Sequence, residues 1–280
     1  MNNPTHRKKY RGPVKAAIMD WSGTLVDAYV VAPSVVFVEI FKKYGVSVTM
    51  SEVRGPMGLR KDAHIQKLLE DPEIRARWMT SHGKPPNADD VAAMYIDFIP
   101  LQLKCLAQYG TLLPGVAGAA NVLRHNYSMK LGATTGFTRA MIDVLLVETE
   151  KQGLHLDATV GGDEVINGSR PQPFMLYRNL DLMNISPIQA VMKVDDSIAG
   201  IDEGLAAGCW TVGVSRYSNY MNIDSVADAE KVSAKELDSQ HSHAKKLLLQ
   251  AGAHYVVDSV AELPQVVEDI NVRLKRGEQA

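Results

Sequence analysis

Five short apolar runs restrict the folds open to this chain more than any other feature of its sequence. They span residues 14–20, 129–136, 190–196, 209–214 and 253–259. Runs of this length are typical of strands buried on both faces of a parallel sheet. Helix-like segments lie between or after them, at residues 139–152, 198–207 and 260–276. The alternation predicts an α/β fold with a doubly wound, mostly parallel sheet.

Residues 28–108 interrupt this alternation and carry little strand signal. Apolar residues recur at helical spacing over residues 37–44, which is typical of an amphipathic helix. Residues 49–52 (TMSE) match a capping box at the start of a second helix, and residues 88–106 indicate another. We therefore expect an all-helical cap domain inserted after the first strand. The expected boundaries are 28–108 for the cap domain, and 1–27 with 109–280 for the α/β core domain.

Composition and charge restrict the kinds of molecule that this chain could bind and the compartment in which we expect it. The chain has 280 residues, 46% of them hydrophobic, and a net charge of −2, so it has ample core and no electrostatic preference for nucleic acid or acidic membranes. No apolar run approaches the roughly 18 residues of a membrane span. The two cysteines, Cys105 and Cys209, form neither a disulfide framework nor a zinc pattern, which favours a cytoplasmic location.

The first apolar run ends in Asp20, which is followed by the turn residues Gly23 and Thr24. In a doubly wound sheet the functional site lies at the carboxyl ends of the strands. A carboxylate there could attack phosphorus to give an aspartyl-phosphate, and the tight turn could aim backbone N–H groups at phosphate oxygens. The alternative is an ordinary strand-to-loop turn with a side-chain hydrogen bond.

Other strand ends carry further polar residues. Thr135 could donate a hydroxyl to a phosphate, and Arg170, in a Gly/Pro loop, could balance its charge. Asp195 and Asp196, together with Asp20, could bind a hard cation such as Mg²⁺. Each residue also has an ordinary interpretation: a strand threonine, a solvated loop arginine, a helix N-cap. Four such features at successive strand ends indicate a phosphate-handling site.

The order of these motifs resembles that of the haloacid dehalogenase superfamily with a helical cap after the first motif. The motifs are Asp20-Trp-Ser-Gly-Thr, Thr135-Gly136, Arg170-Pro171 and Asp195-Asp196. Most members are phosphatases that use a second aspartate, two residues after the first, as general acid and base. Here that position is Ser22, whose hydroxyl cannot exchange a proton readily enough near neutral pH. Either the enzyme is impaired, or its leaving group needs no such acid.

The cap sequence offers a second reactive group. Lys61 and His64 are three residues apart and would share a helix face, which Ile65 and Leu68 extend with apolar side chains. A lysine held against an apolar surface has a lowered pKa, and its neutral amine can form a Schiff base with a carbonyl. The alternative is an exposed lysine in the first turn of a cap helix.

Several motifs together resemble one subfamily, the phosphonoacetaldehyde hydrolases or phosphonatases. They are DWSGTLVD, RGPMGLRK, TTGFTR, SRPQPFM, KVDDS and GCWTVGV. The resemblance implies that Lys61 forms an imine with the aldehyde of phosphonoacetaldehyde and that Asp20 attacks phosphorus, giving acetaldehyde and phosphate. It also implies Mg²⁺ held by Asp20, the backbone carbonyl of Ser22 and Asp196, with Asp195 as a further candidate. A homodimer formed through the cap is expected as well.

The implied chemistry is coherent with the missing acid. A protonated imine lets the departing carbon fragment leave as an enamine, so no proton has to reach a leaving oxygen. The cation and the phosphate-binding groups offset charge on the phosphoryl group. These groups are Gly23, Thr24, Thr135, Gly136 and Arg170. His64 could shuttle protons, Met57 could help to desolvate Lys61, and cap closure would assemble the site.

Three positions depart from the subfamily pattern. Phe137 replaces a tyrosine of some relatives, Gly200 stands where some carry another acid, and Val30 replaces a small polar residue near the hinge. Three other functions stay open. They are a phosphomonoesterase of the same superfamily, a catalytically silent binding or scaffold protein, and a Schiff-base hydrolase of another phosphonate carbonyl compound.

Overall fold

The computed structural model describes residues 9–280, so the first eight residues of the predicted core segment lie outside it. Over this range a parallel sheet of six strands has the order β3-β2-β1-β4-β5-β6. The strands are β1 (Ala16–Met19), β2 (Lys130–Thr135), β3 (Ala158–Gly161), β4 (Val191–Asp195), β5 (Trp210–Val214) and β6 (Tyr255–Val257). The predicted α/β class with a doubly wound parallel sheet is confirmed.

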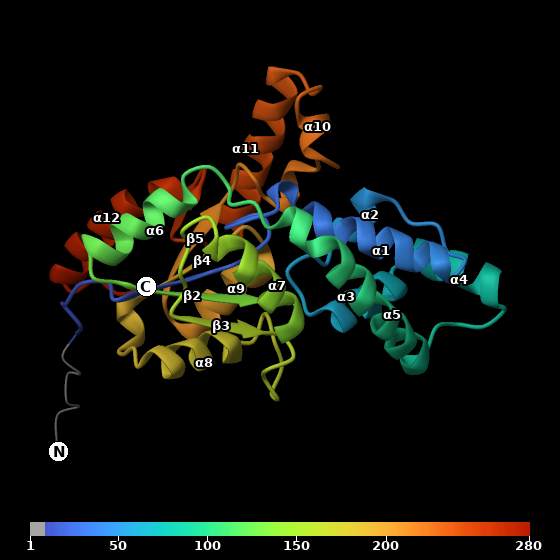
Figure 1. Ribbon diagram of the computed structural model, residues 1–280, viewed down its shortest axis with the longest axis horizontal. Helices are drawn as coiled ribbons and strands as arrows, with labels where there is room; N and C mark the ends of the chain where they lie inside the picture. Colours follow the sequence, from blue (N-terminus) through green and yellow to red (C-terminus); the bar gives the residue numbers. More distant parts are fainter. Residues whose placement is uncertain (1–8) are drawn as a thin grey trace, which may run out of the picture.

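Helices cover both faces of the sheet (Figure 1). They are α6 (Val116–His125), α7 (Arg139–Glu150), α8 (Phe174–Met183), α9 (Ile198–Ala207), α11 (Ala234–Gln250) and α12 (Leu263–Lys275), whereas the short α10 (Val226–Ala229) projects away from the sheet beside α11 (Figure 1). Because side chains of a strand alternate between faces, Ala16 and Ile18 of β1 pack with α8, whereas Ala17 and Met19 pack into the larger cluster beneath α6, α7 and α12. Both faces of β1 are therefore covered by apolar packing, and the polar residues lie at the end of the strand.

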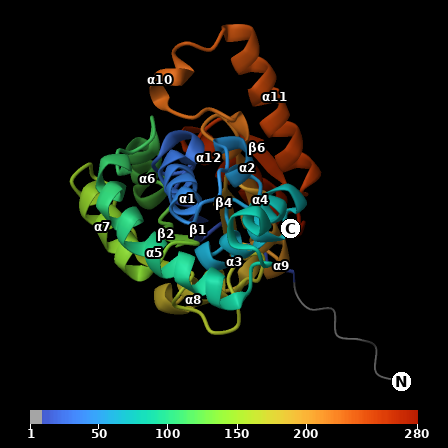
Figure 2. The same cartoon turned by 90° about the vertical axis from the view of Figure 1, so that its right-hand side faces the viewer.

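A second group of helices follows β1 directly and projects from the carboxyl edge of the sheet (Figures 1 and 2). It consists of α1 (Val31–Lys43), α2 (Met50–Arg54), α3 (Lys61–Glu70), α4 (Pro72–His82) and α5 (Ala88–Leu106), with short 3₁₀ turns at Ala28–Val30 and Ala107–Tyr109. Their shared interior contains Phe37, Phe41, Trp78 and Phe98. We call residues 28–108 the cap; their status as a separate domain stays a prediction.

Most expected elements lie where the sequence placed them. The capping box of residues 49–52 forms, since the Glu52 amide donates to the Thr49 hydroxyl and the Thr49 amide donates to the Glu52 carboxylate. The sequence analysis did not identify β3, which is only four residues long and half-exposed at the sheet edge. Among residues 9–280, no helix combines the length and apolarity that crossing a membrane requires.

Candidate active site

A pocket lies where the carboxyl ends of β1, β2 and β4 face the cap. It is lined by Asp20, Ser22, Val30, Pro33, Met57, Gly58, Lys61, Thr135, Gly136, Phe137, Arg170 and Asp196. The core contributes the acids and Arg170, and the cap contributes Lys61 and Met57. Gly136 has no room for a Cβ, because the carbonyl of Leu59 in the cap lies against it. The cap is therefore closed onto the strand ends.

The loop after Asp20 is compact and brings two acids together. The Trp21 carbonyl accepts hydrogen bonds from three successive amides, those of residues 24–26. Gly23 has a φ of +80°, and a Cβ there would lie 2.5 Å from Oδ2 of Asp196. Both the left-handed backbone and the close approach of this carboxylate require glycine. The Gly-Thr turn thus places Asp20 beside the acidic pair after β4.

Asp20, Asp195 and Asp196 form a buried cluster whose ligand oxygens lie within 4.8 Å of one another. Burial raises the pKa of Asp20 to about 6 against the opposing charge of Arg170. Burial, with the charges of Asp20 and Asp195, also raises the pKa of Asp196 well above its usual value. Crowded carboxylates of this kind favour a cation between them, and hard oxygen donors suit a divalent metal. The cluster could therefore hold a metal ion.

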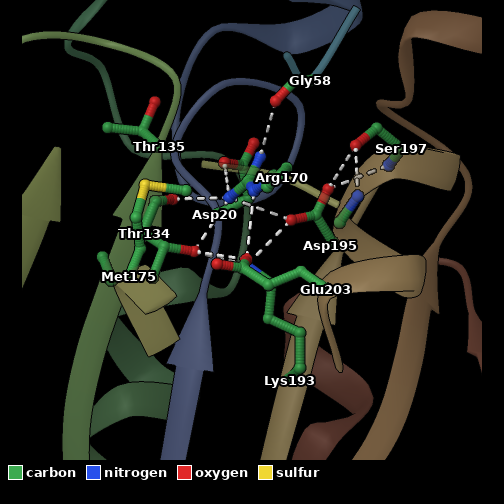
Figure 3. Close-up of polar contacts among 12 residues, drawn as sticks. Asp20, Gly58, Thr134, Thr135, Arg170, Met175, Lys193, Asp195, Ser197 and Glu203 are labelled. Carbon is green, nitrogen blue, oxygen red and sulfur yellow. Dashed lines mark hydrogen bonds and ion pairs between the residues drawn. The ribbon is translucent and has the colours of Figure 1, made fainter. Parts of the chain in front are cut away.

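Arg170 connects the acids to a second, fully buried group of charges (Figure 3). Its Nη2 atom lies 2.7 Å from Asp20 Oδ1 and 3.1 Å from Asp195 Oδ2, and its Nε lies 3.1 Å from Glu203. Nη2 also donates to the carbonyl and hydroxyl oxygens of Thr134. The carboxylates raise the pKa of Arg170 in spite of its burial. Arg170 is a permanent cation with a fixed orientation beside Asp20.

Lys193 completes this group, which we call the Arg170 network: Arg170, Lys193, Asp195, Glu203 and Thr134. Lys193 Nζ lies 2.9 Å from Asp195 Oδ2 and 3.1 Å from Glu203 Oε2, and it donates to the Thr134 hydroxyl. The sequence analysis missed Lys193, Glu203 and Thr134. A signal existed, because a lysine in the middle of a strand buried on both faces must find partners.

Lys61 begins α3 and is only 4% exposed. Its Nζ lies 4.8 Å from the centre of the Phe137 ring and 5.7 Å from that of Phe37. No carboxylate of residues 9–280 forms a salt bridge with it. Burial lowers the pKa of Lys61 to about 8, and the charge of Asp20 opposes this shift. The side chain combines burial, a lowered pKa and access to the same pocket as Asp20.

The two other cap candidates occupy different places. Met57 lines the pocket and is 5% exposed. His64 is fully buried behind Lys61, and among the described residues it does not belong to the pocket lining. Its Nε2 lies 2.8 Å from the Val53 carbonyl, its ring stacks on Phe37, and burial keeps its pKa well below the usual value. The structure does not bring His64 to the pocket wall.

Some of the expected phosphate-binding residues line the pocket, and others do not. Thr135, Gly136 and Arg170 line the pocket, and the Thr135 hydroxyl accepts a hydrogen bond from the Phe137 amide. Thr24 is buried and does not line the pocket, and its hydroxyl has no hydrogen-bond partner within residues 9–280. Its role in phosphate binding stays a prediction.

The departures from the subfamily pattern have structural consequences. A Cβ at Gly200 would overlap the Asp195 carboxylate, so Asp195 fills the space that a side chain at position 200 would need. Val30 lines the pocket and has a φ of +56°, and its neighbours Asp27 and Tyr29 also have positive φ values. Such values strain β-branched residues, so the junction between β1 and the cap holds backbone strain.

Asp27 is a buried acid that the sequence analysis did not single out. Its carboxylate accepts hydrogen bonds from the amides of Val31 and Ala32 at the start of α1. Burial nevertheless raises its pKa to about 7. A helix N-cap motif in the sequence could have identified it, since Asp27 precedes an apolar helical segment.

Comparisons with known proteins agree with this geometry. The family model of haloacid dehalogenase-like hydrolases matches residues 17–214. A phosphonoacetaldehyde hydrolase of Syntrophobacter fumaroxidans is 40% identical over 97% of this chain and 97% of its own length. One of Paraburkholderia xenovorans is 40% identical over 95% of this chain and 98% of its own. The crystal structure of a phosphonoacetaldehyde hydrolase-like protein from Oleispira antarctica superposes with a TM-score of 0.95 at 37% identity, covering both chains completely.

Proposed function

The chain belongs to the haloacid dehalogenase-like hydrolases and, among them, to the phosphonoacetaldehyde hydrolases, and we propose that it hydrolyses the P–C bond of phosphonoacetaldehyde to acetaldehyde and phosphate. One observation carries the proposal. A buried lysine without an anionic partner faces the same pocket as Asp20, in a loop that has Ser22 in place of the usual second acid. This combination suits a carbon leaving group.

Lys61 acts first in this proposal. Its neutral amine adds to the aldehyde carbon, and loss of water with uptake of one proton from solvent leaves a protonated imine. The pKa of about 8 supports this role, because a sizeable fraction of the amine is neutral near neutral pH. Phe37 and Phe137 keep water away from the amine and contact the resulting cation through their ring faces.

Asp20 acts second. Its carboxylate oxygen bonds to phosphorus as the P–C bond breaks, and the bonding electrons pass through the imine to nitrogen, which gives an enamine on Lys61. Protonation of the enamine carbon and hydrolysis of the imine release acetaldehyde. Water then hydrolyses the aspartyl-phosphate. Arg170 holds Asp20 by a 2.7 Å ion pair and offsets charge on the transferring phosphoryl group, together with Thr135.

Mg²⁺ is the cation that we propose for the acidic cluster. Asp20, Asp196 and the backbone carbonyl of Ser22 would hold it, and the bound ion would supply positive charge against the phosphoryl oxygens. Asp195 is the weaker candidate, because Arg170 and Lys193 already neutralise its carboxylate and Ser197 donates to it twice. Within residues 9–280 no cation forms an ion pair with Asp196, which favours it as the ligand.

The remaining candidate residues take secondary roles. We propose that Met57 packs against the bound substrate at the pocket wall. His64 would act through its contact with Phe37 and its place one turn after Lys61, with any proton transfer relayed by water. Gly23 and Thr24 shape the turn, and Gly136 admits the cap.

Borohydride reduction tests the mechanism. Treatment with phosphonoacetaldehyde and borohydride, followed by peptide mass mapping, is expected to place a reduced two-carbon adduct on Lys61. The exposed Lys67 of the same helix provides the internal control, since it pairs with Glu70 and lies outside the pocket. Absence of an adduct at Lys61, with unchanged turnover in Lys61→Ala, would sink the Schiff-base step.

Ser22→Asp distinguishes this proposal from a phosphomonoesterase that has lost its acid. We expect no gain in P–C hydrolysis, because the enamine needs no proton at a leaving oxygen. Activity should be compared on phosphonoacetaldehyde and on simple phosphate monoesters. A clear gain on the phosphonate would show that the missing acid is a defect.

We also propose a homodimer formed through the cap, in the cytoplasm. Ile96 of α5 and Met79 of α4 are 67% and 47% exposed, which supports a contact on the outer cap helices. Both cysteines are free thiols, as a reducing compartment would keep them. Light scattering of the wild type and of Ile96→Lys tests the assembly: a dimer that the substitution leaves intact would place the interface elsewhere.

A further inference from the structure

Arg54 joins the cap to the core at a point outside the pocket. It ends α2 and is 5% exposed. Its guanidinium donates hydrogen bonds to the carbonyl oxygen of Tyr29 (2.7 Å), to the carbonyl oxygen of Ile223 and to the carboxylate of Asp224 (3.2 Å). Tyr29 lies in the turn at the start of the cap, whereas Ile223 and Asp224 follow β5. One cap side chain therefore binds two segments far apart in sequence.

The segment after β5, residues 215–224, is defined here as the β5 loop. Its Asn219 contacts both the cap and the acidic cluster. The Asn219 side chain donates to the Arg54 carbonyl (3.0 Å), and its backbone amide donates to Oδ2 of Asp196 (2.9 Å). Ser218 donates to the Asp196 backbone carbonyl (2.9 Å). A continuous path of hydrogen bonds thus runs from the cap to the carboxylate of Asp196.

The β5 loop also receives the junction between β1 and the cap, since the Tyr29 amide donates to the Tyr217 carbonyl (2.8 Å). Arg54 can bind the Tyr29 and Ile223 carbonyls together only when the cap is closed. If the cap opens, Asn219 loses its acceptor on Arg54, and the loop whose Asn219 amide binds Asp196 loses the contacts that Arg54 makes with it. Closure and the position of the Asp196 carboxylate are therefore linked.

We propose that Arg54 and Asn219 form a latch through which cap closure fixes the Asp196 carboxylate, so that Arg54 is a positioning residue for the metal site. Linkage makes the effect reciprocal: if closure strengthens metal binding by some factor, metal binding favours closure by the same factor. The inference rests on the proposed function through the role given to Asp196. A purely structural Arg54 would stabilise the interface without altering metal affinity.

The test titrates Mg²⁺ alone into the substrate-free protein by calorimetry. Arg54→Met is expected to raise the Kd for Mg²⁺ about five- to tenfold, which is the lower part of the usual range for coupling between sites. Arg77→Met is the matched control, because Arg77 pairs with Glu52 inside the cap. Its Kd should equal that of the wild type. Circular dichroism confirms that each variant is folded.

Asn219→Ala provides an independent variant, since it removes the bond to the Arg54 carbonyl but keeps the backbone amide that binds Asp196. We expect a smaller rise in Kd than in Arg54→Met, because the Arg54 guanidinium still binds the β5 loop through Ile223 and Asp224. A wild-type Kd in Arg54→Met, or in Asn219→Ala should the first variant not fold, overturns the latch. Absence of Mg²⁺ binding in the wild type would instead refute the proposed metal site.

Discussion

Two buried lysines lie near the acidic cluster, and their surroundings differ. Lys193 is fully buried in β4 and contacts Asp195, Glu203 and the Thr134 hydroxyl, all within 3.1 Å. Lys61 is 4% exposed, and its nearest described partners are aromatic rings. The two amines are buried to nearly the same extent, but the charged groups around them differ.

The difference shows what burial does to an amine. Lys193 lies between two carboxylates and a hydroxyl oxygen, which pair its buried amine and give it a structural role in the Arg170 network. The Lys61 ammonium has two ring faces and the more distant charge of Asp20 beside it, so desolvation prevails and its pKa falls to about 8. Burial without a carboxylate partner is therefore what prepares a lysine to act as a nucleophile.

The largest expected effect comes from removing the unpaired lysine. Lys61→Ala should lower kcat for acetaldehyde release by at least about 10³-fold, because the P–C bond then has no electron acceptor. The unfolding free energy should stay constant or rise, since a desolvated ammonium is removed. Lys67→Ala, on the exposed face of the same helix, should retain full activity. Comparable losses in both variants would contradict the assignment.

Removing the paired lysine should act on stability. Lys193→Met leaves Asp195 and Glu203 buried with one cation fewer, which should lower the unfolding free energy by about 3–5 kcal/mol. Urea denaturation measures this, with Lys61→Met as the matched control for loss of a buried amine. Equal stability of the two variants would show that the Arg170 network does not depend on its second cation.

The space around Asp195 allows a sharper test of the paired side. Gly200→Asp should destabilise the protein by about 1–3 kcal/mol, because its side chain overlaps the Asp195 carboxylate. Adding Asp195→Gly to this variant frees that space, and the aspartate at position 200 then supplies a carboxylate in place of that of Asp195. The double variant should therefore be more stable than Gly200→Asp alone, as thermal unfolding would show. Strictly additive losses would mean that the two positions do not share one site.

The sequence predicted the fold and one of the two lysines compared above, Lys61. The alternation of apolar runs was sufficient for the core strands, because buried parallel strands are locally apolar. The edge strand β3 was missed, since a strand of four residues, two of them half-buried, carries little pattern. Asp20, Lys61 and Arg170 were identified from motifs, and the pocket contains all three. Their roles stay predictions.

The Arg170 network could not be predicted in the same way. Glu203 lies in α9 and Lys193 in β4, and only the packing of that helix on the strand brings them within 3.1 Å. The position of the His64 ring also depends on tertiary packing. Helical spacing correctly placed it near Lys61, but the interior of the cap decides that its ring packs on Phe37 instead of facing the pocket.

The next prediction concerns the pH dependence of kcat/KM, which the pKa of Lys61 should control. Because burial lowers the pKa of Lys61 from 10.5 to about 8, the neutral fraction of its amine rises as pH increases through 8. Below that pH, kcat/KM should rise about tenfold per unit and then become level. Initial rates of acetaldehyde release from pH 6.5 to 10 measure this. A rate that still increased tenfold per unit near pH 10 would show a lysine with an ordinary pKa.

The smallest expected effect concerns the ring closest to Lys61. In Phe137→Tyr, a phenol oxygen near Nζ could accept a hydrogen bond from the ammonium, so the apparent pKa in the pH profile should rise by less than about one unit. Phe137→Leu removes the ring and its attraction for the cation, which is worth about 0.5–2 kcal/mol, and should move the same pKa downward. Shifts in one direction for both variants would mean that volume at position 137, and not the ring face, controls Lys61. Opposite shifts would show that the aromatic contact itself helps to set the pKa of Lys61, by opposing part of the effect of burial.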